Sequence, residues 1–456
     1  MINIKIDSRK VKKGDTFVAI KGNTVDGHDY IEKAIENGAE KVICEHGSYD
    51  VETVVVEDTN KYLQDYLIEN YQKELESLKL IGVTGTNGKT TTCFLTYQLL
   101  NKLGIKACYI GTIGFYIEDE VIELANTTPD ILELYNLLLY AKEKKCEVVV
   151  MEVSSHSIDQ QRIKGLKFDV CAFTNLTQDH LDYHKTMDNY CMTKVRLITY
   201  LKQTGKMIVN TDDDYAKYFE SNKSLSLGIN ANNYKIEKFN MENTHTDIIF
   251  KVNDKDYQVK TNLIGKFNVY NYLMSLALIN NLDVCVEDII NVTNEIYAPV
   301  GRAEIIKINN SIAVIDYAHT PDAVSKIITS FKEVTKGKII TIIGCGGDRD
   351  NKKRPIMGKI ATDNSDYVIF TNDNPRCEDE KKIMKDILKG VSKDNYEVEH
   401  DRILAINKGL DLLKDNDTLL ILGKGHEDYQ IIGREKIHLS DKEEVYKYLN
   451  KTKHIN

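Results

Sequence analysis

Short apolar runs alternate along this chain with longer segments in which apolar residues recur every three or four positions. Runs such as residues 80–83 and 148–151 are typical of strands in a parallel sheet that helices cover on both faces. The recurrence of Leu95, Leu99 and Leu103 is the spacing of one face of a helix. The alternation predicts an α/β fold with doubly wound sheets, in which ligands bind at the carboxyl ends of the strands.

The same patterns predict further elements and three domains. Strands are expected at residues 17–20, 54–56, 170–173, 207–209, 312–315, 339–343, 367–370 and 419–422, with residues 54–56 buried. Helical faces are expected through Ile31, Ala34 and Ile35, through Val324, Ile327, Ile328 and Phe331, and through Ile383, Ile387 and Leu388. A length of 456 residues suits two or three domains, and the rhythm restarts after Pro299. We therefore expect a small N-terminal α/β domain (1–77), a central domain with a doubly wound sheet (78–298) and a C-terminal Rossmann-like domain (299–456).

Composition narrows the class of protein. The formal net charge of -9 argues against a general nucleic-acid binder, which carries a basic surplus. The nine cysteines include no C-x-x-C pair, so neither a disulfide framework nor a structural zinc site is expected, and a reducing compartment fits best. The chain starts without an apolar signal-peptide core, and no apolar run is long enough to span a bilayer. We expect a cytoplasmic monomer with no membrane insertion and no nucleic-acid partner.

The segment GVTGTNGKTTT lies between a predicted strand and a predicted helix. Gly85 and Gly88 allow a tight turn, so that backbone N–H groups and the helix N-terminus can face phosphate oxygens. Lys89 is expected to contact the terminal phosphates, and the Thr90 hydroxyl to ligate Mg²⁺. The strict P-loop pattern has a glycine where this chain has Val83, so the loop is a variant. A glycine-rich turn with an exposed lysine is the simpler alternative, but strand, loop, GKT and helix together favour nucleotide binding.

Acidic and histidine residues follow two of the predicted strands. Glu152 comes directly after one apolar run, and Asp179 and His180 come after another. A carboxylate at the carboxyl edge of a sheet is suited to Mg²⁺. His180 alone is more simply a structural histidine, but beside Glu152 we expect it to bind a metal or a phosphate. His180 and His184 are four residues apart, yet HLDYH lacks the glutamate of a zinc-protease helix, so a zinc hydrolase is a poor interpretation.

The chain resembles the Mur ligases almost from end to end, and within that family the members that add the third amino acid to UDP-N-acetylmuramoyl-dipeptide. The blocks that carry the resemblance are DSRKVKKGDTFVAIKG, GVTGTNGKTTT, NTTPD, MEVSSHSIDQQR, FTNLTQDHLDYH, GKFNVYN, GRAE, DYAHTPDA, GCGGDRDNKKRP, DNPRCEDE and GKGHEDYQ. Several blocks in one order are far more specific than the phosphate loop alone. The stretch before DSR is shorter than usual in the family, with six residues before Asp7, so the contact to uracil is expected near Ile6.

The resemblance implies an ATP-dependent ligase that adds meso-diaminopimelate to UDP-N-acetylmuramoyl-L-alanyl-D-glutamate through an acyl-phosphate, in peptidoglycan synthesis for cell-wall formation and division. It implies ATP and Mg²⁺ as cofactors. The ATP-binding residues that it implies are Gly85, Thr86, Asn87, Gly88, Lys89, Thr90, Thr91, Asn268, Asn271, Arg302 and His319. The residues implied for the UDP-linked substrate are Ser8, Asn126, Thr127, Thr128, Ser154, Gln160 and Arg162. Those implied for the amino acid are Arg349, Asp373, Asn374, Pro375, Arg376, Gly423 and Glu427.

Four residues carry catalysis by the same resemblance: Lys89, Glu152, His180 and Lys194. The implied metal ligands are Thr90, Glu152, His180 and Lys194, the last as a carbamate. Addition of CO₂ to a neutral lysine makes an anion that Mg²⁺ can bind, and it requires an amine that is shielded from water or set among cations. Without the resemblance, Lys194 would be expected to lie on the surface of a helix.

The segment DNPR distinguishes family members by their amino acid. In the family it accompanies meso-diaminopimelate, whereas lysine-adding members generally replace the arginine. Arg376 suits the distal carboxylate of diaminopimelate, because a planar guanidinium can bind a carboxylate through two hydrogen bonds. A type I turn with a surface arginine is the simpler alternative.

Three other functions are compatible with parts of the sequence. A paralogous ligase could use another carboxylate or amino acid, such as lysine or a folate-polyglutamate substrate, although DNPR and the SSH…Q-x-R block argue against it. A nucleotide-binding partner protein without ligase activity would be expected to have lost Lys194, Glu152 or His180, and all three are present. A P-loop kinase would leave the third domain without a role.

Overall fold

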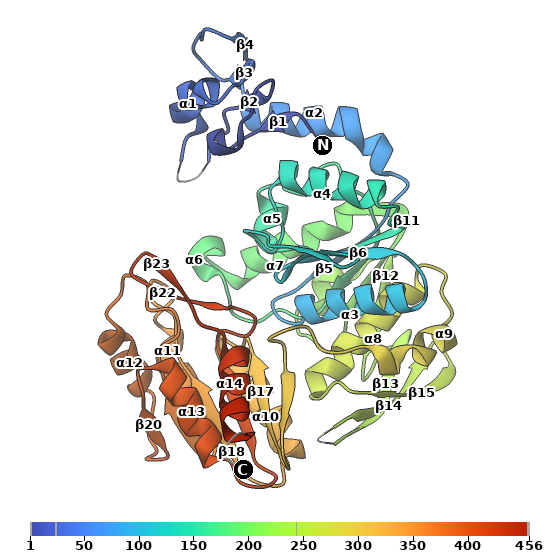
Figure 1. The fold of residues 1–456 in the computed structure, drawn as a ribbon. Coiled ribbons are helices and arrows are strands. Elements are labelled where there is room, and N and C mark those ends of the chain that lie inside the picture. Colours follow the sequence, from blue (N-terminus) through green and yellow to red (C-terminus); the bar gives the residue numbers. More distant parts are fainter. Residues whose placement is uncertain (1, 23–24, 243, 454–456) are drawn as a thin grey trace. The chain divides into compact units, whose positions relative to one another are not determined.

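The structure is a computed structural model that describes residues 2–22, 25–242 and 244–453 (Figure 1). The chain divides into two compact units, and each is described by itself. The first comprises Met1–Gly82, Ile105–Asp169 and Arg196–Gly205, and the second comprises Val83–Gly104, Val170–Val195 and Lys206–Asn456. Helices and sheets alternate in both, which confirms the predicted α/β class.

The N-terminal part of the first unit is a four-stranded parallel sheet with two helices. The strands lie in the order β1 (Ile4–Lys5), β2 (Thr16–Val18), β3 (Lys41–Cys44) and β4 (Glu52–Val55), and the helices are α1 (Ile31–Glu36) and α2 (Thr59–Leu75). Its core contains Phe17, Ile31 and Val42. The prediction that residues 54–56 form a buried strand is wrong, because β4 is an edge strand and Val55 is 57% exposed. An apolar run indicates burial only where neighbouring elements cover the strand, and β4 pairs on one side alone.

The remainder of the first unit contains a sheet region in which one strand ends at Glu152. Its strands lie in the order β5 (Lys79–Thr84), β9 (Val148–Glu152), β6 (Ala107–Gly111), β7 (Gly114–Ile117) and β8 (Glu120–Ile122). β9 and β6 are parallel, whereas β6, β7 and β8 are antiparallel. Helix α4 (Ile131–Glu143) begins after Asp130, whose carboxylate accepts a hydrogen bond from Glu133 N, and the short α5 (Ser155–Asp159) follows β9. Glu152 therefore lies at the carboxyl end of β9, as the sequence predicts.

The second unit begins with the carboxyl end of β5 and the phosphate loop. The strands that lie wholly or in part in this unit follow the order β15 (Lys255–Thr261), β14 (Thr246–Val252), β13 (Tyr234–Met241), β12 (Ser224–Gly228), β11 (Leu201–Asn210), β10 (Phe168–Phe173) and β5. Its helices up to this point are α3 (Lys89–Lys102), α6 (Leu181–His184), α7 (Met187–Val195), α8 (Lys266–Asn280) and α9 (Val286–Asn291). Helices α3 and α8 lie side by side, and Ser275 Oγ donates a 3.0 Å hydrogen bond to Thr92 O. This packing holds the start of α3 against α8.

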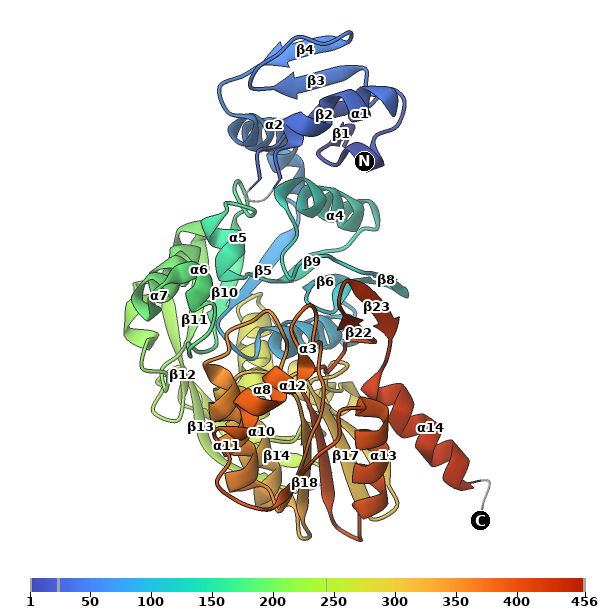
Figure 2. The same ribbon diagram turned by 90° about the vertical axis from the view of Figure 1, so that its left-hand side faces the viewer.

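The C-terminal part of the second unit is a six-stranded sheet with helices on both faces (Figure 2). Its strands lie in the order β16 (Glu304–Ile308), β17 (Ser311–Asp316), β21 (Thr418–Leu422), β18 (Ile339–Ile343), β19 (Tyr367–Phe370) and β20 (Tyr396–Val398), and only β16 is antiparallel to its neighbour. Helices α10 (Pro321–Val334), α11 (Lys353–Asn364) and α12 (Glu380–Leu388) bury one core, and α13 (Arg402–Leu412) and α14 (Asp441–Lys453) bury the other. The hairpin β22 (Tyr429–Ile432) and β23 (Glu435–His438) leaves the carboxyl end of β21. The predicted apolar faces of α10 and α12 are confirmed, since Val324, Phe331 and Ile383 are buried.

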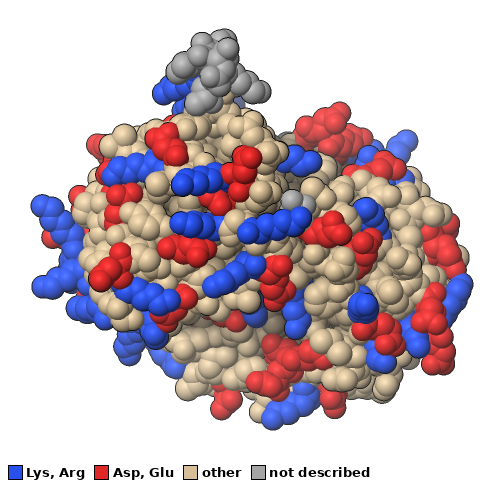
Figure 3. Space-filling view, turned by 90° about the horizontal axis from the view of Figure 1, so that it is seen from below, with Lys and Arg blue, Asp and Glu red and all other residues tan. Residues whose placement is uncertain are grey.

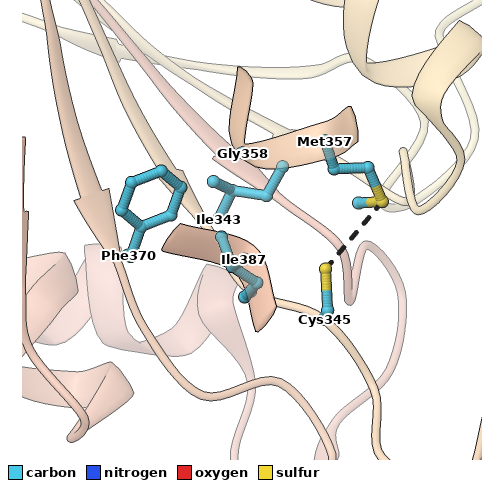
Figure 4. Close-up of a pocket in the computed structure, with 7 residues that line it drawn as sticks. Ile343, Cys345, Met357, Gly358, Phe370 and Ile387 are labelled. Atoms are coloured by element: carbon cyan, nitrogen blue, oxygen red, sulfur yellow. Dashed lines mark hydrogen bonds between the residues drawn. The ribbon is translucent and has the colours of Figure 1, made fainter. Parts of the chain in front are cut away.

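A small apolar recess lies within this C-terminal part (Figure 4). Cys345 Sγ lies 3.9 Å from Met357 Sδ there. The recess is lined by Ile343, Gly344, Cys345, Met357, Gly358, Phe370 and Ile387. With no charged side chain to orient a substrate, it belongs to the core rather than to a binding site.

The charged side chains of the face seen in Figure 3 are of mixed sign, with Lys and Arg interspersed among Asp and Glu. No helix within the described residues combines the length and the apolar character needed to cross a membrane.

Candidate active site

The phosphate loop is held in place by the segment that follows β10. Thr86 N donates to Asn175 O at 2.8 Å, and Asn87 N donates to the Asn175 side-chain oxygen at 3.0 Å. Thr174 Oγ1 in turn donates to Asn87 O at 2.7 Å. Because these two loop amides already have acceptors, the amides that could face an anion are those of the first turn of α3, where the N–H groups of a helix have no intrahelical acceptor.

Gly88 is required by the conformation at the start of α3. Its φ of +85° is a left-handed conformation, and a Cβ there would lie 2.5 Å from the Asn271 side-chain oxygen. Asn271 is buried on α8, where its amide nitrogen donates to Asn268 Oδ1 at 3.1 Å. The structure thus brings the predicted residues Asn268 and Asn271 to the end of the phosphate loop.

Two lysines meet at a single carbonyl of the loop. Lys89 Nζ and Lys194 Nζ each donate to Gly85 O at 2.9 Å, and Lys89 Nζ also donates to Thr86 O at 2.9 Å. Lys194 is 1% exposed, so the expectation of a surface lysine from the residue pattern is wrong. The pKa of Lys194 is lowered well below its usual value, first by burial and then by the charge of Lys89. A lowered pKa favours the neutral amine, which is the form that reacts with CO₂.

Lys194 also contacts an aromatic ring that the sequence did not single out. Its Nζ lies 4.6 Å from the centroid of the Tyr190 ring, and the Tyr190 hydroxyl lies 3.3 Å from Thr86 Oγ1. Tyr190 is buried, and its burial raises the pKa of its hydroxyl. The ring therefore packs against one side of the amine.

A group of charges surrounds Asp179, beyond the end of β10. His180 Nε2 lies 3.5 Å from Asp179 Oδ2. Burial alone would raise the pKa of Asp179, but the neighbouring His180, His319 and Lys353 outweigh it and lower that pKa. Burial and the nearby Lys353 lower the pKa of His319, whose Nδ1 lies 2.8 Å from Tyr317 O. The structure therefore brings the predicted residues His180 and His319 into one electrostatic group.

Arg302 approaches the start of α3. Its Nη2 lies 3.5 Å from Thr90 Oγ1, and its guanidinium carbon lies 4.5 Å from the centroid of the Tyr317 ring. Its Nε is buried without a hydrogen-bond partner among the described residues. Within the phosphate loop, Asn87 Nδ2 donates to Asp322 Oδ2 at 3.0 Å. A guanidinium with an unused buried donor beside a helix N-terminus is well suited to a phosphate oxygen.

Glu152 lies in the first unit, in a network of its own. Its Oε1 accepts hydrogen bonds from Tyr109 Oη at 2.6 Å and Thr112 N at 2.9 Å, and its Oε2 accepts one from Thr112 Oγ1 at 3.1 Å. The Thr127 hydroxyl extends this network, since its Oγ1 lies 3.1 Å from Thr112 Oγ1. Thr128 Oγ1 donates a hydrogen bond to Glu152 O at 2.9 Å. The side chain of Glu152 is fully buried, so these donors hold both of its oxygens in place.

Most residues predicted for the UDP-linked substrate adjoin this network. Arg162 donates from Nη1 to Thr128 O at 2.9 Å and from Nη2 to Gln160 Oε1 at 2.6 Å. Thr128 Oγ1 lies 3.4 Å from Ser154 Oγ. Two further predicted residues lie apart from this network within the described part of the first unit: Ser8 is buried in the N-terminal sheet region, and Asn126 is exposed.

The residues predicted for the amino acid come together at three loops, residues 344–350, 373–376 and 423–427, which we call the amino-acid loops. Arg376 Nη1 donates to Gly347 O at 2.9 Å, and Gly347 N donates to Asn374 O at 2.9 Å. Asn374 Nδ2 donates to Glu427 Oε2 at 2.8 Å. Pro375 O and the Asp373 carboxylate lie so close to Gly347 and Gly423, respectively, that a Cβ on either glycine would clash. Arg349 lies in the first loop but is exposed, and its Nη1 contacts only Asp348 O at 3.3 Å among the described partners.

Arg376 does not adopt the alternative considered above, a type I turn with a surface arginine. Its φ is +54°, and its backbone is fixed by hydrogen bonds from Arg376 N to Ile431 O at 3.0 Å and from Gly433 N to Arg376 O at 2.7 Å. A left-handed conformation at a residue other than glycine costs energy and is retained where the surroundings determine it. The β22 strand therefore sets the direction of the Arg376 side chain.

The oxygen donors among the predicted metal residues fit Mg²⁺, whereas His180 offers a nitrogen. Hydroxyl, carboxylate and carbamate oxygens are the ligands that Mg²⁺ prefers, with several waters retained. Thr90, His180 and Lys194 belong to the second unit and Glu152 to the first. Within the described part of the chain, no group of three or more His, Cys, Asp or Glu residues is arranged to hold a metal ion.

Some residues of the site were missed from the sequence. Thr174 and Asn175 come directly after β10, and this carboxyl-end position, which drew attention to Asp179, was a sufficient signal for them too. Tyr190 and Lys353 have no such signal, because their roles depend on contacts with segments far away in the sequence.

Protein-family models match three consecutive segments of the chain. The model of the Mur ligase family catalytic domain matches residues 2–73, that of the Mur ligase middle domain residues 83–279, and that of the Mur ligase glutamate ligase domain residues 301–425.

Similar proteins extend over almost the whole chain. The chain is 42% identical over 461 residues to a UDP-N-acetylmuramoyl-L-alanyl-D-glutamate–2,6-diaminopimelate ligase of Clostridium botulinum, covering 97% of this chain and 94% of the relative. It is 41% identical over 452 residues to a ligase of the same name from Aquifex aeolicus, covering 98% and 93%. A solved structure of a ligase with that name has a TM-score of 0.70 at 29% identity, covering 99% and 95%. The MurF ligase of Thermotoga maritima in complex with ADP shares the fold, with a TM-score of 0.70 at 21% identity and coverage of 98% and 97%.

Proposed function

The chain belongs to the Mur ligase family, and on that premise we propose that it joins meso-diaminopimelate to UDP-N-acetylmuramoyl-L-alanyl-D-glutamate, with conversion of ATP to ADP and phosphate. The product is a peptidoglycan precursor, and the enzyme acts in the cytoplasm. The observation that carries the choice of amino acid is the DNPR segment, where Arg376 Nη1 donates to Asn374 O and the Asn374 side chain donates to Glu427. An arginine binds the distal carboxylate of diaminopimelate, which lysine and ornithine lack.

The first step is the attack of the glutamyl carboxylate of the acceptor on the γ-phosphorus of ATP, which forms an acyl-phosphate and releases ADP. Both reactants are anions, so their approach requires positive charge around the phosphates. Lys89, the first-turn amides of α3 and Arg302 supply it in the second unit. Asn271, which is bonded to Asn268, packs against Gly88 at the start of the helix that carries Lys89.

The second step is the attack of the amino group of diaminopimelate on the acyl carbon, which gives a tetrahedral intermediate that expels phosphate. Arg376 and Glu427 bind the distal carboxylate and ammonium and thereby hold the amino acid in one direction. The reacting amine must be neutral, because an ammonium has no lone pair to donate.

Mg²⁺ fits this chemistry, because it would neutralise the charge that develops on the phosphate oxygens. In the second unit, Thr90, His180 and, as a carbamate, Lys194 would supply ligands for it. Support for the carbamate comes from the buried position of Lys194 and from its lowered pKa, due first to burial and then to Lys89, since both favour the neutral amine.

The test is phosphate release by the purified protein with the UDP-linked dipeptide, ATP and one of diaminopimelate, lysine or ornithine. We expect release only when acceptor and diaminopimelate are both present. Arg376→Ala should raise the KM for diaminopimelate by about tenfold to a hundredfold, the loss of one charge-assisted pair. Arg434→Ala removes an exposed arginine from the turn between β22 and β23 and serves as the control. Release with lysine at an equal rate, or without acceptor, would contradict the proposal.

A further inference from the structure

A lysine inside the amino-acid loops has no role in the proposed function so far. Lys424 follows β21 directly, between Gly423 and Gly425, and its side chain is fully buried. A buried lysine is costly unless its charge is paired and its donors are used. Its surroundings therefore indicate what its ammonium does.

The Lys424 ammonium binds two side chains of the amino-acid loops at once. Nζ donates to Asn374 Oδ1 at 3.1 Å and to Glu427 Oε2 at 3.1 Å. It also lies 5.4 Å from the centroid of the Tyr429 ring. One ammonium thus connects the DNPR segment with the carboxylate of Glu427.

These contacts determine the orientation of both partners. Asn374 Oδ1 also accepts a hydrogen bond from Ile431 N at 3.0 Å, so the amide oxygen faces two donors and the amide nitrogen must face Glu427. Glu427 Oε2 accepts hydrogen bonds from both Asn374 and Lys424. Both donors therefore bind the same carboxylate oxygen, and neither binds Oε1. The carboxylate of Glu427 is 13% exposed, whereas Lys424 is not exposed at all.

We propose that Lys424 is a positioning residue of the amino-acid site, which holds Asn374 and Glu427 in the orientation that receives the distal ammonium of the incoming amino acid. This inference rests on the proposed function, because it assigns Glu427 to that ammonium. Lys424 does not touch the substrate: it acts through Glu427. Without Lys424, the carboxylate and the amide could each rotate, and part of the binding energy would be lost in ordering them.

The experiment compares Lys424→Met with Lys436→Met, measuring kcat and the KM of each substrate by phosphate release. Lys436 is a matched control because its Nζ lies over the same Tyr429 ring, at 3.8 Å, but on the exposed strand β23. We expect Lys424→Met to raise the KM for diaminopimelate about tenfold or more, with the KM for ATP changed less than about twofold. Lys436→Met should leave all of these constants within about twofold of wild type.

A double variant separates positioning from general support of the fold. If Lys424 acts through Glu427, Lys424→Met should add little to the effect of Glu427→Gln, because the carboxylate that it positions is already gone. The inference is overturned if the two effects multiply, if the KM for ATP rises as much as that for diaminopimelate, or if Lys424→Met behaves as wild type. If Lys424→Met does not fold, Lys424→Gln replaces it, because glutamine keeps a smaller hydrogen-bond donor. The change in the KM for diaminopimelate relative to that for ATP then tests the inference.

Failure of the proposed function gives a different result. Wild-type protein that releases no phosphate with diaminopimelate contradicts the proposed function, whereas active wild type with an unchanged Lys424→Met contradicts only this inference. Calorimetric binding of diaminopimelate to wild type and to Lys424→Met tests the positioning role without turnover. We expect affinity to fall by about the same factor as the KM rises.

Discussion

At the scale of single residues, burial decides which chemical form a side chain can take. Lys194 illustrates this, because it is 1% exposed and shares the Gly85 carbonyl with the charged Lys89. Burial, and after it the charge of Lys89, lowers the pKa of Lys194. The neutral amine is the nucleophile for CO₂, and the resulting carbamate is an anion that the neighbouring ammonium stabilises. The charge of Lys89, which helps to keep the amine neutral, therefore also favours the modified form.

We expect Lys194→Met to lose catalysis without losing the fold. Methionine fills most of the lysine volume in a buried site, while the amine and any carbamate disappear. Phosphate release should fall by about a hundredfold or more, in line with the loss of a buried charge that stabilises the reacting groups. In protein supplied with ¹³C-bicarbonate, an NMR signal of a carbamate should be present in wild type and absent in the variant.

Lys185→Met is the control for that prediction. Lys185 lies just before α7 and is exposed, so its loss should leave both the carbamate signal and the turnover unchanged. Full turnover by Lys194→Met, or an identical NMR signal in it, would contradict the carbamate.

The sequence predicted residues at strand ends better than residues buried by distant contacts. Glu152 and Asp179 were found because they follow apolar runs, and such positions converge at one edge of a sheet. The burial of Lys194 results from contact with Gly85, 109 positions away, and no local pattern contains that information. The resemblance to a family supplied Lys194, whereas Lys424 was missed because GKGHE was interpreted only through Gly423 and Glu427.

At the scale of elements, the start of α3 depends on one glycine. We expect Gly88→Ala to lower the free energy of unfolding by about 2–3 kcal/mol, since it combines a left-handed conformation with a steric clash. The clash is with the Asn271 side-chain oxygen, 2.5 Å from the added Cβ. The KM for ATP should rise as well, because the loop can relieve the clash only by moving.

Gly104→Ala isolates the conformational part of that cost. Gly104 follows the end of α3 with a φ of +78°, and no atom lies within 4 Å of an added Cβ. Its replacement should cost about 1 kcal/mol and leave the KM for ATP unchanged. Urea unfolding followed by far-UV circular dichroism measures the free energy of unfolding of both variants. Equal decreases would show that the contact with Asn271 adds nothing to the cost of Gly88→Ala.

Apolar runs predicted the covered strands and failed at exposed edges. The runs that became β5, β9, β18 and β21 lie between helices or neighbouring strands, so continuous hydrophobicity matches their surroundings. The run at β4 lies at an edge, and there the same signal wrongly indicated burial. Strands β13, β14 and β15 were not predicted from such runs. They alternate buried and exposed positions in an antiparallel arrangement.

At the scale of the whole molecule, the order of motifs indicated which loops carry the chemistry. Packing decides which of these loops touch. The amino-acid loops come from the carboxyl ends of β18, β19 and β21, as a doubly wound sheet requires. Their mutual hydrogen bonds, such as that from Asn374 to Glu427, depend on side-chain orientations that no spacing encodes. The two compact units each join segments that are separated in the chain, so they do not test the predicted domain borders at 77 and 298, which stay predictions.

The resistance of the molecule to acid should depend on a buried arginine behind the amino-acid loops. Arg354 is 1% exposed on its side chain and donates to Glu378 Oε1 at 2.8 Å, to Glu378 Oε2 at 2.6 Å and to Gly346 O at 3.2 Å. Asp386 Oδ2 lies 3.2 Å from the same guanidinium. Removal of one partner from such a buried pair leaves an uncompensated charge, which typically costs about 3–5 kcal/mol.

The hydrogen bonds from Arg354 lower the pKa of Glu378 from 4.5 to about 2. Because the folded pKa lies below the unfolded one, this stabilisation is complete above the unfolded value of 4.5 and is lost as pH falls from there toward 2. We expect Glu378→Gln to unfold at lower urea concentration than wild type at pH 7, and the difference to shrink by about 1.4 kcal/mol for each pH unit below that value. Glu333→Gln, at an exposed position of α10, should show no such dependence. Far-UV circular dichroism suits the measurement, because the chain has no tryptophan. A difference between wild type and Glu378→Gln that stays constant down to pH 3.5 would mean that the carboxylate is not charged by Arg354 in the folded protein.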